Sequence, residues 1–279
     1  MELHKTFDNG FEYIEIVNKS GRAKIALQGA HLFHYERMGE RPLLWLSETS
    51  FFEPGKAIRG GVPICWPWFG KHQTDSSLPQ HGFARTSLWT VVEINEIDEH
   101  ATEVILHLKS SARSLQLWPY TFELQLHVTV AGTLTITLTT INCDEKAFTI
   151  SSALHSYFTV SNIDNVYIEG LDNTTYFDVL TQESIVQKGN VHIAGEVDRI
   201  YQNVHYPLTI HDQKRIVYID AQGSSSAVVW NPWKDKSASM GDMKDDAYTT
   251  MLCVETANAL DDGRTLQPGD EHTVSAILS

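Results

Sequence analysis

The stretch Thr121–Asn142, TFELQLHVTVAGTLTITLTTIN, decides the fold class of this chain. Apolar residues alternate with polar ones along two runs, which is typical of strands that bury one face. Between the runs, Ala131 and Gly132 supply a tight turn. The apolar residues of both runs share one face of the predicted hairpin: Phe122, Leu124, Leu126, Val128 and Val130, then Leu134, Ile136 and Leu138. The stretch therefore predicts a long antiparallel hairpin.

The same alternation recurs in shorter segments along the chain. Half-buried strands are expected in FEYIEIV (11–17), AKIALQG (23–29) and EVILHLK (103–109). Further strands are expected in NVYIEGL, RIVYIDAQ, SAVVWNPW, MLCVETAN and HTVSAIL, which Gly, Asp, Asn and Pro clusters separate. No segment of about 12 residues has a convincing helical pattern. Residues 234–248 are the one polar insertion with room for a short helix, and we interpret their charges as a solvated loop.

These segments predict an all-β fold of sandwich type, with antiparallel sheets. A chain of 279 residues can bury a large core, and single all-β domains often reach about 200–250 residues. No repeat, low-complexity tract or flexible linker divides the sequence. We therefore expect one domain over residues 1–279.

The composition excludes several classes of partner. The chain is 42% hydrophobic and 20% charged, as ordinary globular proteins are. With 21 Lys and Arg against 35 Asp and Glu, the net charge is −14, which works against binding to nucleic acids and anionic membranes. The sequence has neither a signal peptide nor an apolar run of about 20 residues, so a cytoplasmic location is expected. An acidic protein that binds a small anion must gather cations locally.

Metal and thiol chemistry are not expected. Cys65, Cys143 and Cys253 have no CxxC spacing, and we interpret them as buried free thiols. The histidines lack the HxH and HExxH spacings of metal sites, and no glycine-rich phosphate loop is present. The side chains available as metal ligands are His31, His34, His81, His155, Glu271 and His272.

The segment IRGGVPICWPWFG (58–70) combines one arginine with glycines, prolines and flat rings. Arg59 cannot lose its proton to escape burial, so it requires either a protein carboxylate or a bound anion. The glycines that follow it would let the backbone approach a ligand closely. The rings of Trp66, Trp68 and Phe69 could pack against sugar rings, although at least one tryptophan is expected to fill the core instead.

Two titratable residues lie in apolar, strand-like sequence. His155 occurs in SSALHSYFTV, where it could be a core histidine bonded to the backbone or a catalytic group. Glu255 occurs in MLCVETAN, where it must point into the core or into a cavity. A partnered structural acid is the alternative for Glu255.

Taken in order, several motifs resemble those of the glucose-6-phosphate 1-epimerases (D-hexose-6-phosphate mutarotases) of the aldose 1-epimerase superfamily. The motifs are IRGGVPICWPWFG, QHGFAR, ALHSYF, VDRIYQN, VVWNPW and MLCVETAN, and they span Ile58 to Asn258. The resemblance implies a galactose-mutarotase-like β-supersandwich that needs no metal and no organic cofactor. It also implies an isomerase that interconverts the α and β anomers of a hexose 6-phosphate, with glucose 6-phosphate as the expected substrate. We expect a monomer whose partner is a small sugar phosphate.

The resemblance further implies a role for each matched residue. His155 would be the general acid and Glu255 the general base. The remaining residues would bind the substrate: His81 and Asp198 the sugar hydroxyls, Arg59 and Arg85 the 6-phosphate. Trp68 would offer its ring to the sugar. At neutral pH the carboxylate and a substrate phosphate would raise the pKa of His155, whereas burial would lower it.

Three alternatives stay open at this point. An epimerase of unphosphorylated aldoses would use the same acid and base without a phosphate site. It is distinguished by whether Arg59 and Arg85 converge with no protein carboxylate between them. A non-catalytic carbohydrate-binding or sugar-sensing protein would use the aromatic rings without needing the acid and base. A lyase or another isomerase on a related sandwich would release a product other than the anomer.

Overall fold

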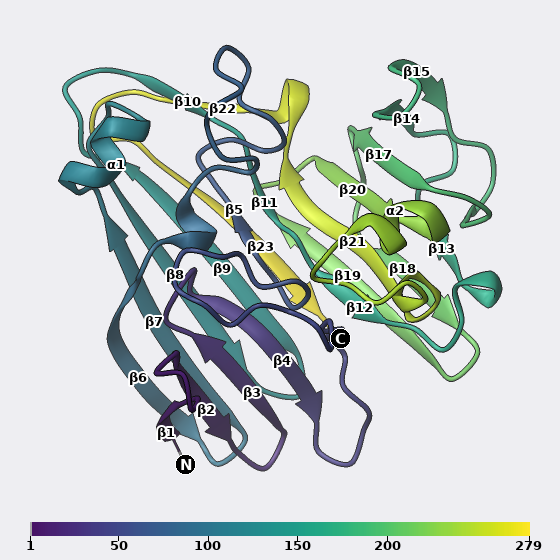
Figure 1. Cartoon of the computed structure of the whole chain (residues 1–279), viewed down its shortest axis with the longest axis horizontal. Coiled ribbons are helices and arrows are strands. Elements are labelled where there is room, and N and C mark those ends of the chain that lie inside the picture. Colours follow the sequence, from purple (N-terminus) through teal and green to yellow (C-terminus); the bar gives the residue numbers. More distant parts are fainter. Residues whose placement is uncertain (1) are drawn as a thin grey trace.

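The predicted hairpin lies within the largest sheet of the protein. The computed structural model describes residues 2–279 (Figure 1), and its strands form sheets of nine, eight, four and two strands. The hairpin consists of β8 (Phe122–Val130) and β9 (Leu134–Asn142), whose register pairs Val130 with Leu134. Both strands alternate buried and partly exposed residues along their whole length, as the sequence predicts.

The nine-stranded sheet has the order β16-β13-β18-β19-β23-β9-β8-β7-β6. Its other strands are β6 (Thr90–Asp98), β7 (Ala101–Lys109), β13 (Tyr167–Glu169), β16 (Val191–His192), β18 (Leu208–Asp212), β19 (Arg215–Gln222) and β23 (Glu271–Leu278). Every ladder in this sheet is antiparallel.

The eight-stranded sheet has the order β15-β14-β17-β20-β21-β11-β5, with β12 also paired to β21. Its strands are β5 (Ile64–Cys65), β11 (Ser152–Leu154), β12 (Tyr157–Thr159), β14 (Thr175–Asp178), β15 (Glu183–Val186), β17 (Val197–Gln202), β20 (Ser226–Asn231) and β21 (Met251–Asn258). The four-stranded sheet contains β1 (Glu2–Thr6), β2 (Glu12–Val17), β3 (Gly21–Ala26) and β4 (His31–Arg37). A small ribbon joins β10 (Phe148–Ile150) and β22 (Arg264–Leu266).

Helices are short, as the sequence predicts. The α-helices are α1 (Ala112–Leu117) and α2 (Trp233–Ser239). The 3-10 turns are η1 (Ala84–Thr86), η2 (Ile163–Asn165), η3 (Ala247–Thr250) and η4 (Leu260–Asp262). No helix within residues 2–279 is long and apolar enough to cross a membrane.

The sheets are layered so that they share one core. In Figure 1 the nine-stranded sheet crosses the molecule, the four-stranded sheet lies over its left part, and the eight-stranded sheet lies to the right. Strand β3 packs against β8, and β21 packs against β23. One apolar cluster therefore contains Ile25 of β3, Leu126 of β8 and Val254 of β21. The expected all-β sandwich with antiparallel sheets is confirmed, and burial of its alternating apolar faces stabilises it.

The cysteine interpretation is correct for two residues and wrong for the third. Cys65 and Cys253 are buried free thiols, but Cys143 is exposed. The reason is that β9 ends at Asn142, so Cys143 already belongs to the turn that follows the strand.

Candidate active site

The strand register brings His155 next to Glu255. Strand β21 pairs with β11 through Thr256 and Leu154, and with β12 through Cys253 and Tyr157. Between these two ladders the partner strand is interrupted, and His155 occupies the interruption beside Glu255. Residues 100 positions apart in the sequence thus meet in the middle of one sheet.

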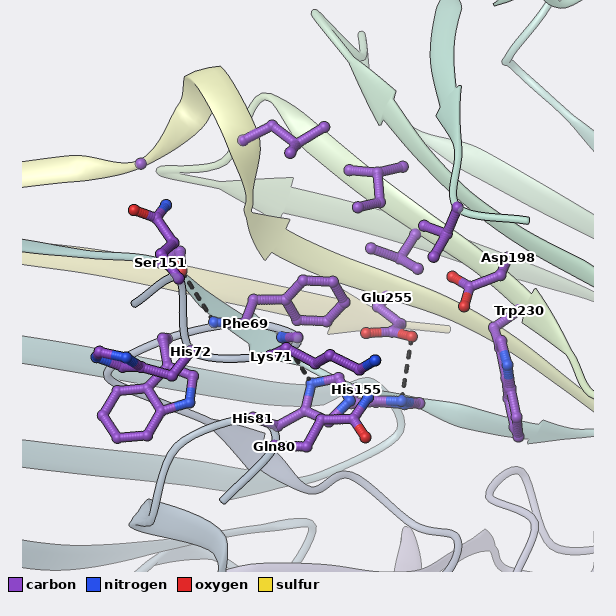
Figure 2. Close-up of a pocket in the computed structure, with 18 of the residues that line it drawn as sticks. Phe69, Lys71, His72, Gln80, His81, Ser151, His155, Asp198, Trp230 and Glu255 are labelled. Carbon is purple, nitrogen blue, oxygen red and sulfur yellow. Dashed lines mark hydrogen bonds and ion pairs between the residues drawn. The ribbon is translucent and has the colours of Figure 1, made fainter. Parts of the chain in front are cut away.

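The two side chains meet at the wall of a large cavity. Nε2 of His155 lies 3.3 Å from Oε1 of Glu255, and the two side chains are 9% and 1% exposed. Figure 2 shows this contact with Asp198 and Trp230 beside it. The cavity has a volume of about 1030 Å³. It is lined by all seven residues that the sequence suggests: Arg59, Trp68, His81, Arg85, His155, Asp198 and Glu255.

Burial dominates the electrostatics of the His155–Glu255 pair. Desolvation, followed by the nearby His81, Arg85 and Arg59, lowers the pKa of His155 well below its ordinary value. Desolvation, with a smaller contribution from Asp198, raises the pKa of Glu255 well above its ordinary value, and Arg85 opposes this. In the protein without substrate, burial is therefore the largest influence on the pKa of His155. Burial therefore disfavours the charged form of each group in the protein without substrate.

Each member of the pair also has an unsatisfied polar atom. Among the described residues, neither Nδ1 of His155 nor Oε2 of Glu255 has a hydrogen-bond partner, although both atoms are buried. Buried polar atoms are usually paired, and exceptions often occur at functional sites. The imidazole is held instead by stacking on Tyr157, with ring centroids 4.8 Å apart and planes 9° apart.

His81 is held as a hydrogen-bond donor toward the cavity. Its φ of 64° turns the chain, and its backbone N–H donates to the Gly70 carbonyl at 2.7 Å. The Gly70 N–H in turn donates to Nδ1 of His81 at 3.2 Å. Burial, aided by Arg85 and Arg59, lowers the pKa of His81 to about 3. A neutral imidazole that accepts at Nδ1 carries its proton at Nε2, where it can donate to a ligand oxygen.

Asp198 lies on β17 opposite Trp230 of β20, and both line the cavity. Burial, with contributions from Glu196 and Asp178, raises the pKa of Asp198 to about 6, while Lys236 opposes this rise. A carboxylate at this position can accept hydrogen bonds from ligand hydroxyls.

The raised pKa of Asp198 predicts a stability effect that depends on pH. The unfolded chain ionises this carboxyl from about pH 4, but the folded protein does so only near pH 6, so the group destabilises the fold increasingly as pH rises through this window. We expect Asp198→Asn to raise the free energy of unfolding by about 2–3 kcal/mol at pH 8 and by about half of that at pH 5. Urea unfolding at both pH values measures this, with the exposed Asp235→Asn as control. A gain that does not change with pH would contradict the prediction.

The two tryptophans of the segment 58–70 have different roles. Trp66 is fully buried and donates from Nε1 to Oγ1 of Thr140 on β9, so it fills the core. Trp68 lines the cavity and is fixed by a hydrogen bond of 2.9 Å from Nε1 to the Pro79 carbonyl. The expectation that at least one tryptophan is a core residue is confirmed, and Trp68 with Phe69 forms an aromatic part of the cavity wall.

The expectation that Gly60 and Gly61 let the backbone approach a ligand is wrong. Neither glycine is among the residues that line the cavity. A Cβ at Gly60 would lie 2.5 Å from the Trp45 carbonyl oxygen, and one at Gly61 would lie 2.3 Å from that of Leu32. The glycines are needed because protein backbone passes close to them.

Arg59 already has a protein carboxylate. Its Nε donates to Oδ2 of Asp242 at 3.1 Å, and its Nη1 donates to the hydroxyl of Tyr157 at 3.1 Å. Burial alone lowers the pKa of Arg59, but Tyr157 and Asp242 together raise it by more, so the pKa lies above its ordinary value. A phosphate site was expected to have arginines without a protein carboxylate beside them. Arg59 does not meet this criterion, because Asp242 already pairs with it.

The interpretation of residues 234–248 as a solvated loop needs correction. This segment contains most of α2 and the start of η3, and its Met243 is buried. Asp242 reaches Arg59, and Lys236 lines the cavity while donating to Glu196 at 2.9 Å. The charges of the segment thus belong partly to the cavity wall.

Arg85 differs from Arg59 in its partner. Its Nη2 donates to the backbone carbonyl of Gln80 at 2.8 Å, and within residues 2–279 it forms no ion pair with a carboxylate. Because Arg85 also lines the cavity, its charge is available to a bound anion.

Sequence reasoning missed several residues of the cavity. Lys71 directly follows the motif IRGGVPICWPWFG, and Trp230 lies inside the motif VVWNPW, so position next to a motif was the available signal for both. The missed residues that carry polar or aromatic groups include Lys71, His72, Gln80, Trp230 and Lys236. Among residues 2–279 no three His, Cys, Asp or Glu side chains are grouped so that they could hold a metal ion.

Comparison with known proteins links the chain to one family. The sequence profile of the aldose 1-epimerase family matches residues 12–279. A protein from Escherichia coli strain K12, provisionally named glucose-6-phosphate 1-epimerase, is 37% identical over 260 residues, which cover 92% of this chain and 86% of that protein. A protein of the same provisional name from Salmonella typhimurium is 39% identical over 242 residues, covering 85% and 80%. The crystal structure of YeaD from Salmonella typhimurium, described provisionally as a mutarotase, superposes with a TM-score of 0.92 at 34% identity and covers 99% of this chain and 92% of that one.

Proposed function

The chain belongs to the aldose 1-epimerase family, and we propose that it interconverts the α and β anomers of a hexose 6-phosphate, with glucose 6-phosphate as substrate. The observation that carries this proposal is the His155–Glu255 pair, 3.3 Å apart at the wall of a cavity large enough for a sugar phosphate. The names of the relatives support the choice of a phosphorylated sugar. A cytoplasmic location is part of the same proposal.

The chemistry requires one base and one acid. Anomer exchange removes the proton of the C1 hydroxyl while the ring oxygen receives one, and the C1–O5 bond breaks to give the open aldehyde. Rotation about C1–C2 presents the other face of the aldehyde, and the reverse transfers close the ring. We assign Glu255 as the base at the C1 hydroxyl and His155 as the acid at the ring oxygen.

One proton shared by Glu255 and His155 accounts for the carboxylate and the imidazolium that the reaction needs. In the free protein the proton lies on Glu255, because burial disfavours both charged forms. Its transfer across the 3.3 Å contact to Nε2 of His155 produces the carboxylate and imidazolium that the reaction needs, without proton uptake from solvent. A bound phosphate dianion favours the imidazolium by Coulomb attraction.

Other residues of the cavity would orient the sugar. Nε2 of His81 and the carboxyl group of Asp198 suit hydrogen bonds with ring hydroxyls, and the Trp68 ring offers an apolar surface to the C–H face of the sugar. We assign the phosphate to the side of Arg85. Arg59 takes part through the guanidinium N–H groups that Asp242 and Tyr157 leave open.

Exchange spectroscopy by NMR tests the proposed function. We expect the purified protein to increase the α-to-β exchange rate of glucose 6-phosphate well above its rate in buffer, and to act much less on glucose and galactose, which lack the phosphate. Buffer with an equal concentration of an unrelated protein is the control. Equal exchange of all three sugars would indicate the epimerase of unphosphorylated aldoses, and binding without exchange would indicate a sugar-binding protein.

A further inference from the structure

The basic residues of the cavity fall into two groups. Four Lys and Arg side chains line it: Arg59, Lys71, Arg85 and Lys236. Two of them are paired with carboxylates, Arg59 with Asp242 at 3.1 Å and Lys236 with Glu196 at 2.9 Å. In the part of the chain that the structure describes, the other two have no ion-pair partner: Arg85 donates only to the Gln80 carbonyl, and Lys71 is exposed. The uncompensated positive charge of the cavity thus comes from Lys71 and Arg85.

Lys71 and the guanidinium of Arg85 both lie close to the contact between Gly70 and His81. The backbone N–H of His81 donates to the Gly70 carbonyl at 2.7 Å, and Lys71 and Gln80 are the chain neighbours of these two residues. The guanidinium of Arg85 is fixed on the carbonyl of the same Gln80 at 2.8 Å. Figure 2 shows Lys71 beside Gln80, extending toward the region of the His155–Glu255 pair. Both uncompensated cations therefore lie near this backbone contact in the cavity wall.

The distribution of charge favours binding of an anion near Lys71 and Arg85. A phosphate monoester carries a charge near −2 at neutral pH, and the protein as a whole carries −14, so only a local excess of cations can attract it. Arg59 and Lys236 provide little excess because a carboxylate already faces each of them. Arg85 offers a fixed fork of donors, and Lys71 offers a mobile ammonium that can follow the phosphate.

We propose that Lys71, together with Arg85, binds the phosphate of the substrate and determines the preference for phosphorylated over free sugars. This proposal rests on the proposed function for the identity of the ligand. In this proposal Lys71 contacts the phosphate and not the reacting atoms, so its loss affects binding of the phosphorylated sugar and not the proton transfers.

Steady-state kinetics of Lys71→Ala tests the proposal. One charge-assisted contact to phosphate corresponds to about a tenfold change in affinity, so we expect KM for glucose 6-phosphate to rise about tenfold with kcat unchanged. Exchange of free glucose should not change. Lys71→Arg, which keeps the charge, should restore most of the affinity. The exposed Lys188→Ala, which removes the same charge elsewhere, is the matched control.

Titration with inorganic phosphate, followed by NMR chemical shifts, keeps this proposal separate from the proposed function. A weaker affinity for phosphate in Lys71→Ala and Arg85→Ala, but not in Lys188→Ala, supports the phosphate site even if no sugar phosphate is turned over. If glucose 6-phosphate is exchanged and Lys71→Ala has an unchanged KM, the proposed function stands and the role of Lys71 is rejected. A similar loss on free glucose also rejects it, because that result indicates a structural role.

Discussion

Glu255→Gln is expected to lower the rate of glucose 6-phosphate anomer exchange by about 10²–10⁴-fold, the range typical of a lost general acid or base. The amide keeps the shape of the carboxylic acid but cannot accept the proton of the C1 hydroxyl. It also removes the proton that Glu255 passes to Nε2 of His155 over 3.3 Å. We expect His155→Ala to cause a loss in the same range, since the ring oxygen then has no donor. The double variant should be little worse than either single one, because the two residues act as a unit.

Folding controls decide how such a loss is interpreted. Because burial raises the pKa of Glu255, this carboxyl destabilises the fold at neutral pH, where the unfolded chain ionises it. A neutral amide removes this cost, so Glu255→Gln should not lower the free energy of unfolding and should raise it at neutral pH. Circular dichroism and urea unfolding measure this, and the exposed Glu183→Gln serves as the control for activity. Wild-type exchange rates in both Glu255→Gln and His155→Ala would reject the acid and base assignments while leaving the family membership intact.

The strands could be predicted because a half-buried strand requires apolar and polar residues to alternate in the local sequence. Alternation along Thr121–Asn142 specifies which side chains are buried whatever the strand pairs with, and β8 and β9 follow it residue by residue. No local sequence pattern specifies which distant strands pair with one another. The order in which β21 lies between β20 and the broken strand β11–β12 depends on contacts over about 100 residues.

The candidate site was predictable only as a set of residue types and motifs. His155 and Glu255 stand out because each is a polar residue in apolar sequence. The partner of Arg59 was not predictable, because Asp242 lies 183 residues away in a polar segment that has no strand pattern. The charge state of His155 and Glu255 could not be predicted either, because it depends on how deeply both groups are buried. Lys71 was missed because an exposed lysine looks the same in a sequence whether or not it faces a cavity.

The glycine pair shows the same limit and leads to the second prediction. Gly61 has a φ of 63°, and a Cβ there would lie 2.3 Å from the Leu32 carbonyl oxygen, 2.6 Å from Cα of Phe33 and 2.9 Å from Nε2 of His31. Two of these atoms belong to the backbone of β4, which cannot move without disturbing the four-stranded sheet. We expect Gly61→Ala to lower the free energy of unfolding by at least about 4 kcal/mol, which combines left-handed strain with overpacking.

The substitution should also disturb the cavity, because Gly61 connects β4 to the residues beside His155. Its N–H donates to the Trp45 carbonyl at 2.7 Å, and its carbonyl accepts from the N–H of Tyr157 at 2.9 Å, the residue that stacks on the imidazole of His155. Any backbone shift at Gly61 therefore displaces Tyr157, and folded Gly61→Ala protein should also exchange anomers more slowly. Urea unfolding and the NMR exchange rate measure the two effects. Gly195→Ala is the matched control, since a Cβ there meets open space. Wild-type stability of Gly61→Ala would mean that β4 yields to the added methyl group, and the close backbone approach would then not explain the glycine.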